Sequence, residues 1–160
     1  MAWRDLVPWL LVLHVLAAIV AIGPNFTYAT IRTMGRREPP HANFATRVSH
    51  AISATLVYPV GLVIPATGLA MIVILGLDLT SRALWWLDIA IATYAAVYLY
   101  SYFVQRSIVE RIIALTSAPP PPEGYPTELA ALATRAQRGG TAMLVLLVIV
   151  ASLMVVKPQL

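Results

Sequence analysis

The chain has 160 residues, of which 59% are apolar and 11% are charged, and its mean hydropathy is +0.78. A soluble domain carries about a quarter charged residues, so this composition excludes a water-soluble globule and an intrinsically disordered chain. The net charge of +4 does not indicate nucleic-acid binding, because the arginines lie between apolar runs, and the absence of cysteine excludes disulfides, thiolate metal sites and cysteine nucleophiles. The composition is that of an integral membrane protein.

Four apolar stretches predict membrane-spanning helices at about 6–31, 51–77, 83–104 and 141–156. A helix needs about 20 residues to cross a hydrocarbon core of about 30 Å, and no stretch alternates like a strand of a membrane barrel. We therefore expect an all-α fold in which one transmembrane domain, residues 1–160, forms a four-helix up-down bundle. We expect the first helix to be retained, because Pro24 follows the small-residue triplet that a signal peptidase would need.

The prolines and glycines predict bends and linkers. Pro59 and Pro65 each remove a backbone donor from the second span and should bend it. The proline run at 119–122 should end the helix that continues from the third span and act as a stiff spacer. Residues 127–137 are expected to form a short helix, and the fourth span reaches full length only if the glycine pair before it joins it.

The basic residues predict the orientation in the membrane. The links at 32–50 and 105–140 together hold eight arginines, whereas the opposite end of the bundle holds only Arg4, Arg82 and Lys157. Basic residues concentrate in short cytoplasmic loops. We therefore expect both links in the cytoplasm and both termini outside.

Polar residues inside the predicted spans are the candidate functional residues, because burying them in a bilayer is costly and no standard catalytic signature is present. His14 heads a stripe of the first span that continues through alanines to Asn25 and Tyr28. Asp88 heads a similar stripe of the third span, with alanines leading to Tyr102. Both His14 and Asp88 stand eighteen positions before an arginine at the cytoplasmic boundary, so we expect them at similar depth. Small residues let helices approach closely, so both stripes are expected to face the bundle interior.

Two interpretations of His14 and Asp88 remain open. In the functional one they form a proton-relay or ligand-orienting pair. In the structural one they share only a hydrogen bond, or Asp88 is solvated at the outer interface beside Trp85 and Trp86. Spans one and three are diagonal in an up-down bundle, so a direct contact would require tight packing, and otherwise a water or a cofactor would fill the gap.

Histidine and tyrosine patterns offer two further hypotheses. The spacing of His14 and His50 argues against both as axial ligands of one haem, because it separates them by roughly 20 Å along the bundle axis. His14 alone can still bind haem b. Tyr94, Tyr98 and Tyr102 recur at every fourth position of the third span. Such a strip suits either a radical or quinone-facing surface or ordinary helix packing.

Short apolar motifs near both ends of the chain resemble those of a known family. They are Leu-His-Val-Leu-Ala-Ala at 13–18, the glycine at 23, and Leu-Met-Val-Val-Lys-Pro at 153–158. The family is bacterial and consists of predicted integral membrane proteins, the domain of unknown function twenty-two sixty-nine; this chain departs from its pattern by lacking a tryptophan before the glycine. That family is distantly similar to four-helix membrane proteins of the copper-resistance-D and haem-b-binding protoporphyrinogen oxidase type. The resemblance implies a place in the inner membrane of a bacterium. It also implies a haem or metal role for His14, although no second histidine lies at the right depth.

Two classes of function follow. The first is an accessory or structural membrane subunit that packs against a membrane-protein partner or a second copy of the chain. The alternative is a membrane protein that binds haem b or another small ligand and has a redox or transport role centred on His14 and Asp88. The small size, the alanine-lined stripes and the lack of a catalytic motif favour the accessory subunit. No metal cluster is expected, and the lipid bilayer is the expected environment.

Overall fold

A computed structural model describes residues 3–118 and 127–158. Four long helices make up the fold, and each is long and apolar enough to cross a membrane: Trp3–Arg37, Pro39–Leu75, Arg82–Leu115 and Thr127–Val156. No strand occurs within the described ranges. The prediction of an all-α protein with four membrane-spanning helices is confirmed.

Span one is interrupted once. It consists of the 3-10 turn η1 (Trp3–Leu6), helix α1 (Val7–Ile22) and helix α2 (Pro24–Arg37), which are separated by Gly23. Because Pro24 has no backbone N–H, the helical hydrogen bonding is broken at this point. The side-chain amide of Asn25 donates to the carbonyl oxygens of Ala21 at 3.2 Å and Ile22 at 3.1 Å. Asn25 therefore supplies a donor to two carbonyl groups next to the break.

Span two contains a π-helical segment. It runs through η2 (Pro39–His41), α3 (Ala42–Ile52), the π-helical η3 (Ser53–Val57) and α4 (Tyr58–Leu75). Gly76 ends α4 with a φ of 64°, a left-handed conformation that glycine adopts without strain. The expected link at 32–50 is thus largely helical, and α3 extends span two well beyond the apolar stretch.

Spans three and four complete the bundle. Span three comprises η4 (Arg82–Leu84), α5 (Trp85–Leu99), the π-helical η5 (Tyr100–Gln105) and α6 (Arg106–Leu115), and span four is the single helix α7 (Thr127–Val156). Helix α7 runs through both glycines at 139 and 140, so the short helix expected at 127–137 is the first part of span four. The predicted proline spacer at 119–122 lies outside the described residues.

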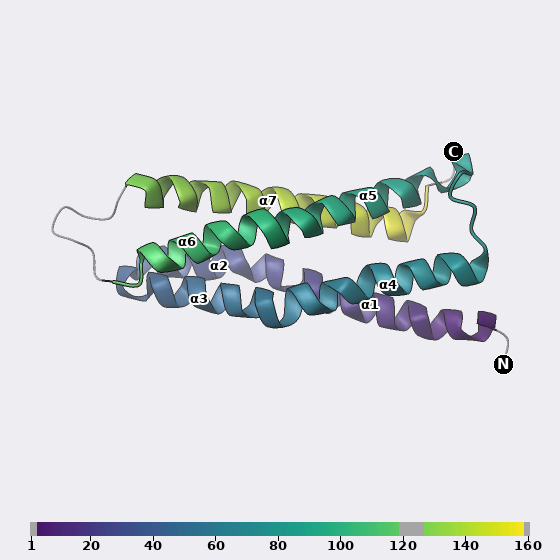
Figure 1. Ribbon diagram of the computed structural model, residues 1–160, viewed down its shortest axis with the longest axis horizontal. Coiled ribbons are helices and arrows are strands. Elements are labelled where there is room, and N and C mark those ends of the chain that lie inside the picture. The colour runs from purple at the N-terminus through teal and green to yellow at the C-terminus, as the bar shows by residue number, and fades with distance from the viewer. Residues whose placement is uncertain (1–2, 119–126, 159–160) are drawn as a thin grey trace.

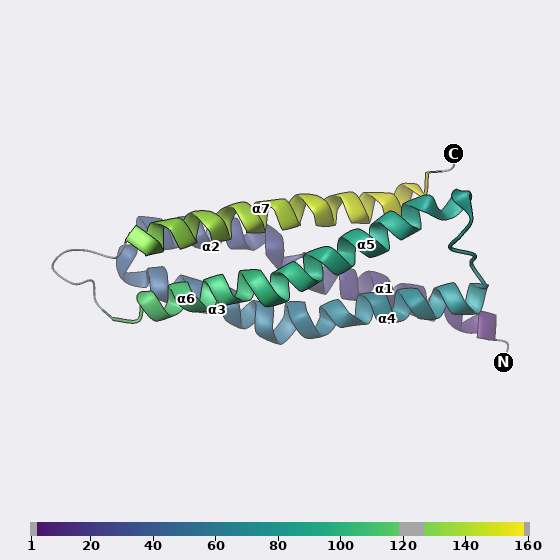
Figure 2. The same cartoon turned by 45° about the horizontal axis from the view of Figure 1, so that its top comes forward.

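The helices pack in a ring that follows the chain order. Helix α1 packs chiefly against α4, α2 against α3, α3 against α6, and α5 against α7, while α2 makes a smaller contact with α7. Spans one and three are therefore diagonal, as expected. Span three crosses the bundle obliquely, from α3 at one end to α7 at the other (Figure 1, Figure 2). We call the end that holds η1 and the turn at 76–81 the terminal end, and the opposite one the arginine-rich end.

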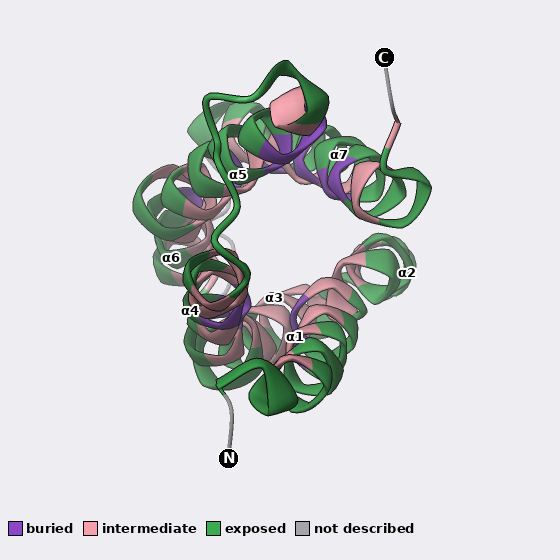
Figure 3. Cartoon of the chain, turned by 90° about the vertical axis from the view of Figure 1, so that its right-hand side faces the viewer, coloured by how far each residue is buried: buried purple, intermediate pink, exposed green. Residues whose placement is uncertain are grey.

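Two small apolar clusters form the core. One joins Ala17 and Ala21 of α1 to Ile64 of α4, and the other joins α5 to α7. Tyr94 packs against both clusters, so it links the two helix pairs. The buried faces point toward the bundle axis and the exposed faces point outward (Figure 3). Large apolar side chains such as Ile19, which is 63% exposed, cover the outside, where a bilayer would surround them.

Candidate functional site

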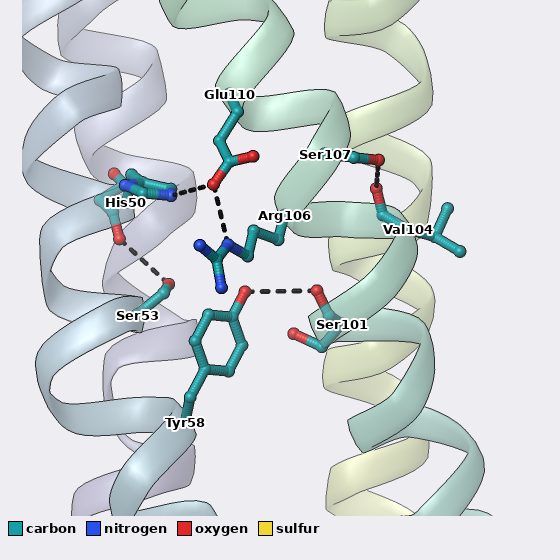
Figure 4. Close-up of polar contacts among 9 residues, drawn as sticks. His50, Ser53, Tyr58, Ser101, Val104, Arg106, Ser107 and Glu110 are labelled. Atoms are coloured by element: carbon teal, nitrogen blue, oxygen red, sulfur yellow. Dashed lines mark hydrogen bonds and ion pairs between the residues drawn. The ribbon is translucent and has the colours of Figure 1, made fainter.

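The two π-helical segments approach each other where spans two and three meet (Figure 4). Tyr58, which directly follows η3, donates its hydroxyl to the carbonyl oxygen of Ser101 within η5 at 3.2 Å. Ser53, at the start of η3, donates to the Ser49 carbonyl oxygen at 3.0 Å, so its oxygen accepts the 2.8 Å hydrogen bond from the Tyr28 hydroxyl. Single π-helical turns are rare and are frequent at functional sites. Hydrogen bonds thus connect both segments to neighbouring helices.

A charged cluster lies beside this contact, toward the arginine-rich end (Figure 4). Arg106 Nε donates to Glu110 Oε1 at 2.8 Å, and the same oxygen lies 3.3 Å from His50 Nε2 on α3. The His50 contact lacks hydrogen-bond geometry, so it acts as an ion pair when the imidazole is protonated. Glu110 lies beyond the expected span 83–104, and the charged hydrogen bond from Arg106 is stronger than one between neutral groups. We call Tyr58, Ser101, Arg106, Glu110 and His50 the polar junction.

The tyrosines of span three have different partners. Tyr94 donates to the Gly61 carbonyl oxygen at 2.8 Å, and Tyr98 donates to the Tyr58 carbonyl oxygen at 3.0 Å. Tyr102 is 38% exposed; its ring stacks on Tyr98, and the Arg106 guanidinium lies 5.4 Å from its centroid. These contacts support the packing interpretation of the tyrosine strip.

The Gly61 carbonyl is the one that Pro65 leaves without its helical partner, because the residue four positions later normally donates to it. Tyr94 supplies the missing donor from the neighbouring span. The absence of a side chain at Gly61 permits this approach, since an added Cβ would lie 3.1 Å from Tyr98 Cε2 and 3.3 Å from the Tyr94 hydroxyl. The Tyr94 hydroxyl on span three therefore replaces the backbone donor that Pro65 removes from span two.

A small cavity of about 30 Å³ lies at the centre of the bundle, between all four spans. Polar groups of Asn25, Tyr58, Tyr94, Tyr98 and Ser101 line it together with apolar side chains of α1, α5 and α7. A volume of this size accommodates about one or two water molecules. The polar junction and this cavity form one polar region that reaches from the arginine-rich end to the bundle centre.

His14 lies at the other end of the bundle, in the contact between α1 and α4. Its Nδ1 is 2.9 Å from Thr67 Oγ1. Thr67 has a single hydroxyl proton and uses it toward the carbonyl oxygens of Val63 at 2.7 Å and Ile64 at 3.0 Å. All these contacts are satisfied together when Nδ1 donates to Thr67 Oγ1, which is the tautomer that leaves the lone pair on Nε2. The interior position of the His14 stripe is confirmed, because Ala17 and Ala21 are each only 4% exposed.

The expected interior position of the Asp88 stripe is wrong. Asp88, Ala92 and Ala95 are exposed, and Leu99, which continues the same face, is 54% exposed. Helix α5 instead buries the opposite face: Trp86, Leu87, Ala90 and Val97. Val97 packs against Met143 and Leu147 of α7. Large apolar groups gain more from burial than alanines do. No hydrogen bond or ion pair joins Asp88 to His14 in the described part of the chain.

The structure also tests whether the residues present suit a haem. His50 belongs to the polar junction and lies seventeen residues from Thr67 on span two, which corresponds to about 25 Å of helix. A bis-histidine haem between His14 and His50 therefore does not fit. The protonation of His14 Nδ1 does suit a single axial ligand, because metal-binding histidines commonly donate through the second ring nitrogen. Among the described residues, no group of three or more His, Asp or Glu side chains could hold a metal ion.

Sequence reasoning missed the polar junction and the partner of Tyr94. The signals were present: Pro65 indicates an unpaired carbonyl four residues earlier, and the tyrosines of span three are the donors that could satisfy it. The π-helical segments left no comparable signal, because π turns have no strong residue preference that a single sequence would show.

Comparison with known proteins agrees with this architecture. The chain matches the model of the family described as predicted integral membrane protein (DUF2269) over residues 8–158. The chain belongs to that family. No curated protein and no solved structure matches it. The DUF2269 match covers all four spans, so the family as a whole is expected to share the helical bundle described here.

Proposed function

We propose that the protein is an accessory membrane subunit that docks another transmembrane helix against the outer face of α5. This face comprises Asp88, Ala92, Ala95 and Leu99, and its exposure is the observation that carries the proposal. Alanines at such spacing let two helix backbones approach closely, and close packing is the main driving force for helix association in a bilayer. A partner helix would therefore gain more on this face than on the bulky outer face of α1.

Asp88 supports the same interpretation. It lies in the first turn of α5, where the helix dipole favours a carboxylate. It remains exposed on the face that would otherwise meet lipid, and charged groups within membrane segments are commonly paired with a partner. A cationic or hydrogen-bond-donating side chain on the partner helix would satisfy it. The partner is either another membrane protein or a second copy of this chain.

Site-directed photo-crosslinking tests the proposal directly. The chain has no cysteine, so Ala92→Cys or Ala95→Cys provides a unique attachment site for benzophenone maleimide. Illumination of native membranes should give a protein adduct of defined mass at these positions. An adduct of twice the chain mass of 17.4 kDa would identify a second copy, and any other defined mass would identify a different partner.

The matched control is Ile19→Cys, which places the same probe on the exposed outer face of α1. It should give lipid adducts without a protein adduct of defined mass. Lipid adducts alone at the α5 positions, or the same protein adducts at both faces, would contradict a specific docking face.

We also propose that the protein lies in a bacterial inner membrane with both termini outside. The arginine-rich end, which contains Arg32, Arg36 and Arg47, supports this orientation by the positive-inside rule. Reporters fused after Ser117 and after Leu160 should show a cytoplasmic and an external location, respectively. An external location of the Ser117 fusion would reverse the assignment.

A second candidate function is the binding of haem b or another small ligand at His14, with a redox or transport role. It is supported by the free lone pair of Nε2, which the hydrogen bond from Nδ1 to Thr67 implies. A bound haem would supply one-electron redox chemistry, and His14 would hold its iron. Asp88 takes no part in this candidate, because it lies on the outer face of a different helix pair.

An absorption spectrum of the protein purified from haem-replete cells tests the haem candidate. A Soret band that disappears in His14→Ala and survives in His50→Ala would support ligation by His14. A colourless protein would rule out the haem and leave the docking function untouched, since the two rest on different helices.

A further inference from the structure

An open groove lies on the outside of the bundle at the arginine-rich end. It has a volume of about 580 Å³ and runs along the first half of α7, next to the start of η5. Its lining residues are Tyr100, Ala130, Ala131, Thr134, Arg135, Arg138 and Gly139. From Ala130 to Gly139 the helix advances about 14 Å. The small side chains hollow the groove, and the two arginines make it cationic.

The groove lies at the boundary between the charged and the apolar parts of the bundle. Arg138 is the last charged residue of α7 before the apolar run at 141–156. Gln105 of η5 donates to the Ala136 carbonyl oxygen at 2.9 Å, and Arg32 Nη2 would lie 3.7 Å from a Cβ at position 140. The boundary residues of three spans are therefore at one level, where phospholipid headgroups meet a membrane protein.

Neither arginine of the groove is neutralised within the described residues. Glu128, the acidic residue at the start of α7, instead pairs with Arg111 at 3.1 Å. Arg135 and Arg138 are three positions apart, so they lie on the same side of the helix. Two guanidinium groups in this arrangement can each donate hydrogen bonds to a phosphate.

The surface beyond the groove suits an acyl chain. Continuing along α7 from Arg138 at helical spacing, the same side presents Ala142, Val145 and Ile149, all of which are exposed. Val145 is 52% and Ile149 is 46% exposed. A cationic groove that continues into an apolar track has the chemistry of a phospholipid molecule, with its phosphate at the arginines and a tail along the track.

We propose that this groove binds an anionic glycerophospholipid, with its phosphate held by Arg135 and Arg138 and one acyl chain lying along α7. The net negative charge of the headgroup distinguishes this ligand from a zwitterionic phospholipid. The site lies on α7 and η5, and it is separate from the proposed docking face of α5.

Native mass spectrometry of the full chain in a neutral detergent tests the proposal, with phosphatidylglycerol and phosphatidylcholine of identical acyl chains as probes. The protein should retain one phosphatidylglycerol in preference to phosphatidylcholine. Arg135→Gln combined with Arg138→Gln should lower the affinity for phosphatidylglycerol by about tenfold or more. The matched control combines Arg4→Gln with Arg82→Gln, which removes the same charge at the terminal end and should leave the affinity unchanged. Equal losses in both double variants, or no loss in the first, would overturn the proposal.

A second variant tests the groove without changing its charge. Ala131 is exposed, so Ala131→Phe should fill the groove and leave the fold intact, as checked by circular dichroism. Retention of phosphatidylglycerol should fall, and unchanged retention would place the lipid elsewhere and overturn the proposal. Inorganic phosphate at matched ionic strength should not displace the lipid; displacement would show a site for phosphate itself and would also overturn it.

Discussion

At the scale of single residues, side-chain donors lie beside both proline positions at which the helical hydrogen bonding of the bundle is interrupted. Asn25 donates to the Ala21 and Ile22 carbonyls next to the break at Pro24, and Tyr94 donates to the Gly61 carbonyl, which Pro65 leaves without its helical partner. In a bilayer such groups have no water to bond, so a side-chain donor nearby is needed. The polar residues that sequence reasoning marks as functional candidates thus include structural ones.

The Tyr94→Phe variant should lower the free energy of unfolding by about 1–3 kcal/mol, because the buried Gly61 carbonyl then lacks a donor. Equilibrium unfolding in mixed micelles measures this loss. Tyr102→Phe is the matched control: no hydrogen bond of the Tyr102 hydroxyl is found among the described residues, and its ring contacts are retained. If the two variants are equally stable, Tyr94 has no such role.

Replacing Pro65 tests whether the Tyr94 hydroxyl is needed because Pro65 lacks a backbone N–H. Pro65→Ala returns a backbone N–H to α4, so the Gly61 carbonyl regains its helical partner. Tyr94→Phe should therefore cost less in the Pro65→Ala background than in the native chain. Additive losses in this double-mutant cycle would show that the two residues act independently.

The charge of Glu110 predicts a pH dependence. Arg106 Nε donates to its carboxylate at 2.8 Å, and protonation of the carboxylate removes the charge from this contact, so the contact stabilises the fold at neutral pH and is weakened in acid. The native protein should be more stable than Glu110→Gln at neutral pH, and the difference should vanish in acid. Unfolding midpoints of both proteins from pH 7 to pH 3 measure it; a constant difference would contradict the assignment.

At the scale of helices, the glycine pair of α7 does not break the helix, and one of its two members permits close packing against η5. Both glycines lie inside a continuous helix. A Cβ at Gly139 would lie 2.7 Å from the Tyr100 hydroxyl and 2.8 Å from Gln105 Oε1, whereas a Cβ at Gly140 would meet nothing closer than 3.7 Å. The first glycine thus allows η5 to pack against α7, and the second has room for a side chain.

This contrast predicts opposite effects of one substitution at adjacent positions. Gly139→Ala should destabilise the protein by about 1–3 kcal/mol through overpacking. Gly140→Ala should leave the stability unchanged or raise it by up to about 1 kcal/mol, because alanine has the higher helix propensity. Thermal unfolding in one detergent compares the two, and equal effects would show that the contact with η5 is not tight.

At the scale of the whole molecule, the number of spans and the inward face of span one could be predicted from the sequence. The inward face of span three could not. Apolar length alone predicts four spans, and the alanine stripe below His14 is buried as expected. For α5, a helical wheel shows that Asp88 and Ala92 share a face but not which face is inward. Burial of Trp86 and Leu87 removes more apolar surface from water than burial of alanine does, so the face with Trp86 and Leu87 is the inward one. The polar junction depends on the two π-helical segments, and no residue pattern in the sequence predicts where such segments form.

The separation of His14 and Asp88 predicts independent effects on stability. His14 belongs to the contact of α1 with α4, and Asp88 lies on the exposed face of α5. In the isolated chain Asp88→Asn should be nearly silent, and its effect should add to that of His14→Ala within about 0.3–0.5 kcal/mol. Unfolding of both single variants and the double variant in nanodiscs measures this. A clear departure from additivity would restore the paired interpretation.

The two π-helical segments also fix the rotational phase of the spans. Each bonds from a residue to the fifth one before it, and therefore holds one residue more than an α-helical path would. One residue corresponds to about 100° of rotation about the helix axis. Deleting a single residue from η5 would thus give a more regular helix and at the same time turn Glu110 away from His50. A family member that lacks the extra residue of one π-helical segment would therefore have to lack the extra residue of the other segment as well. Only then would the contacting faces of spans two and three still point toward each other.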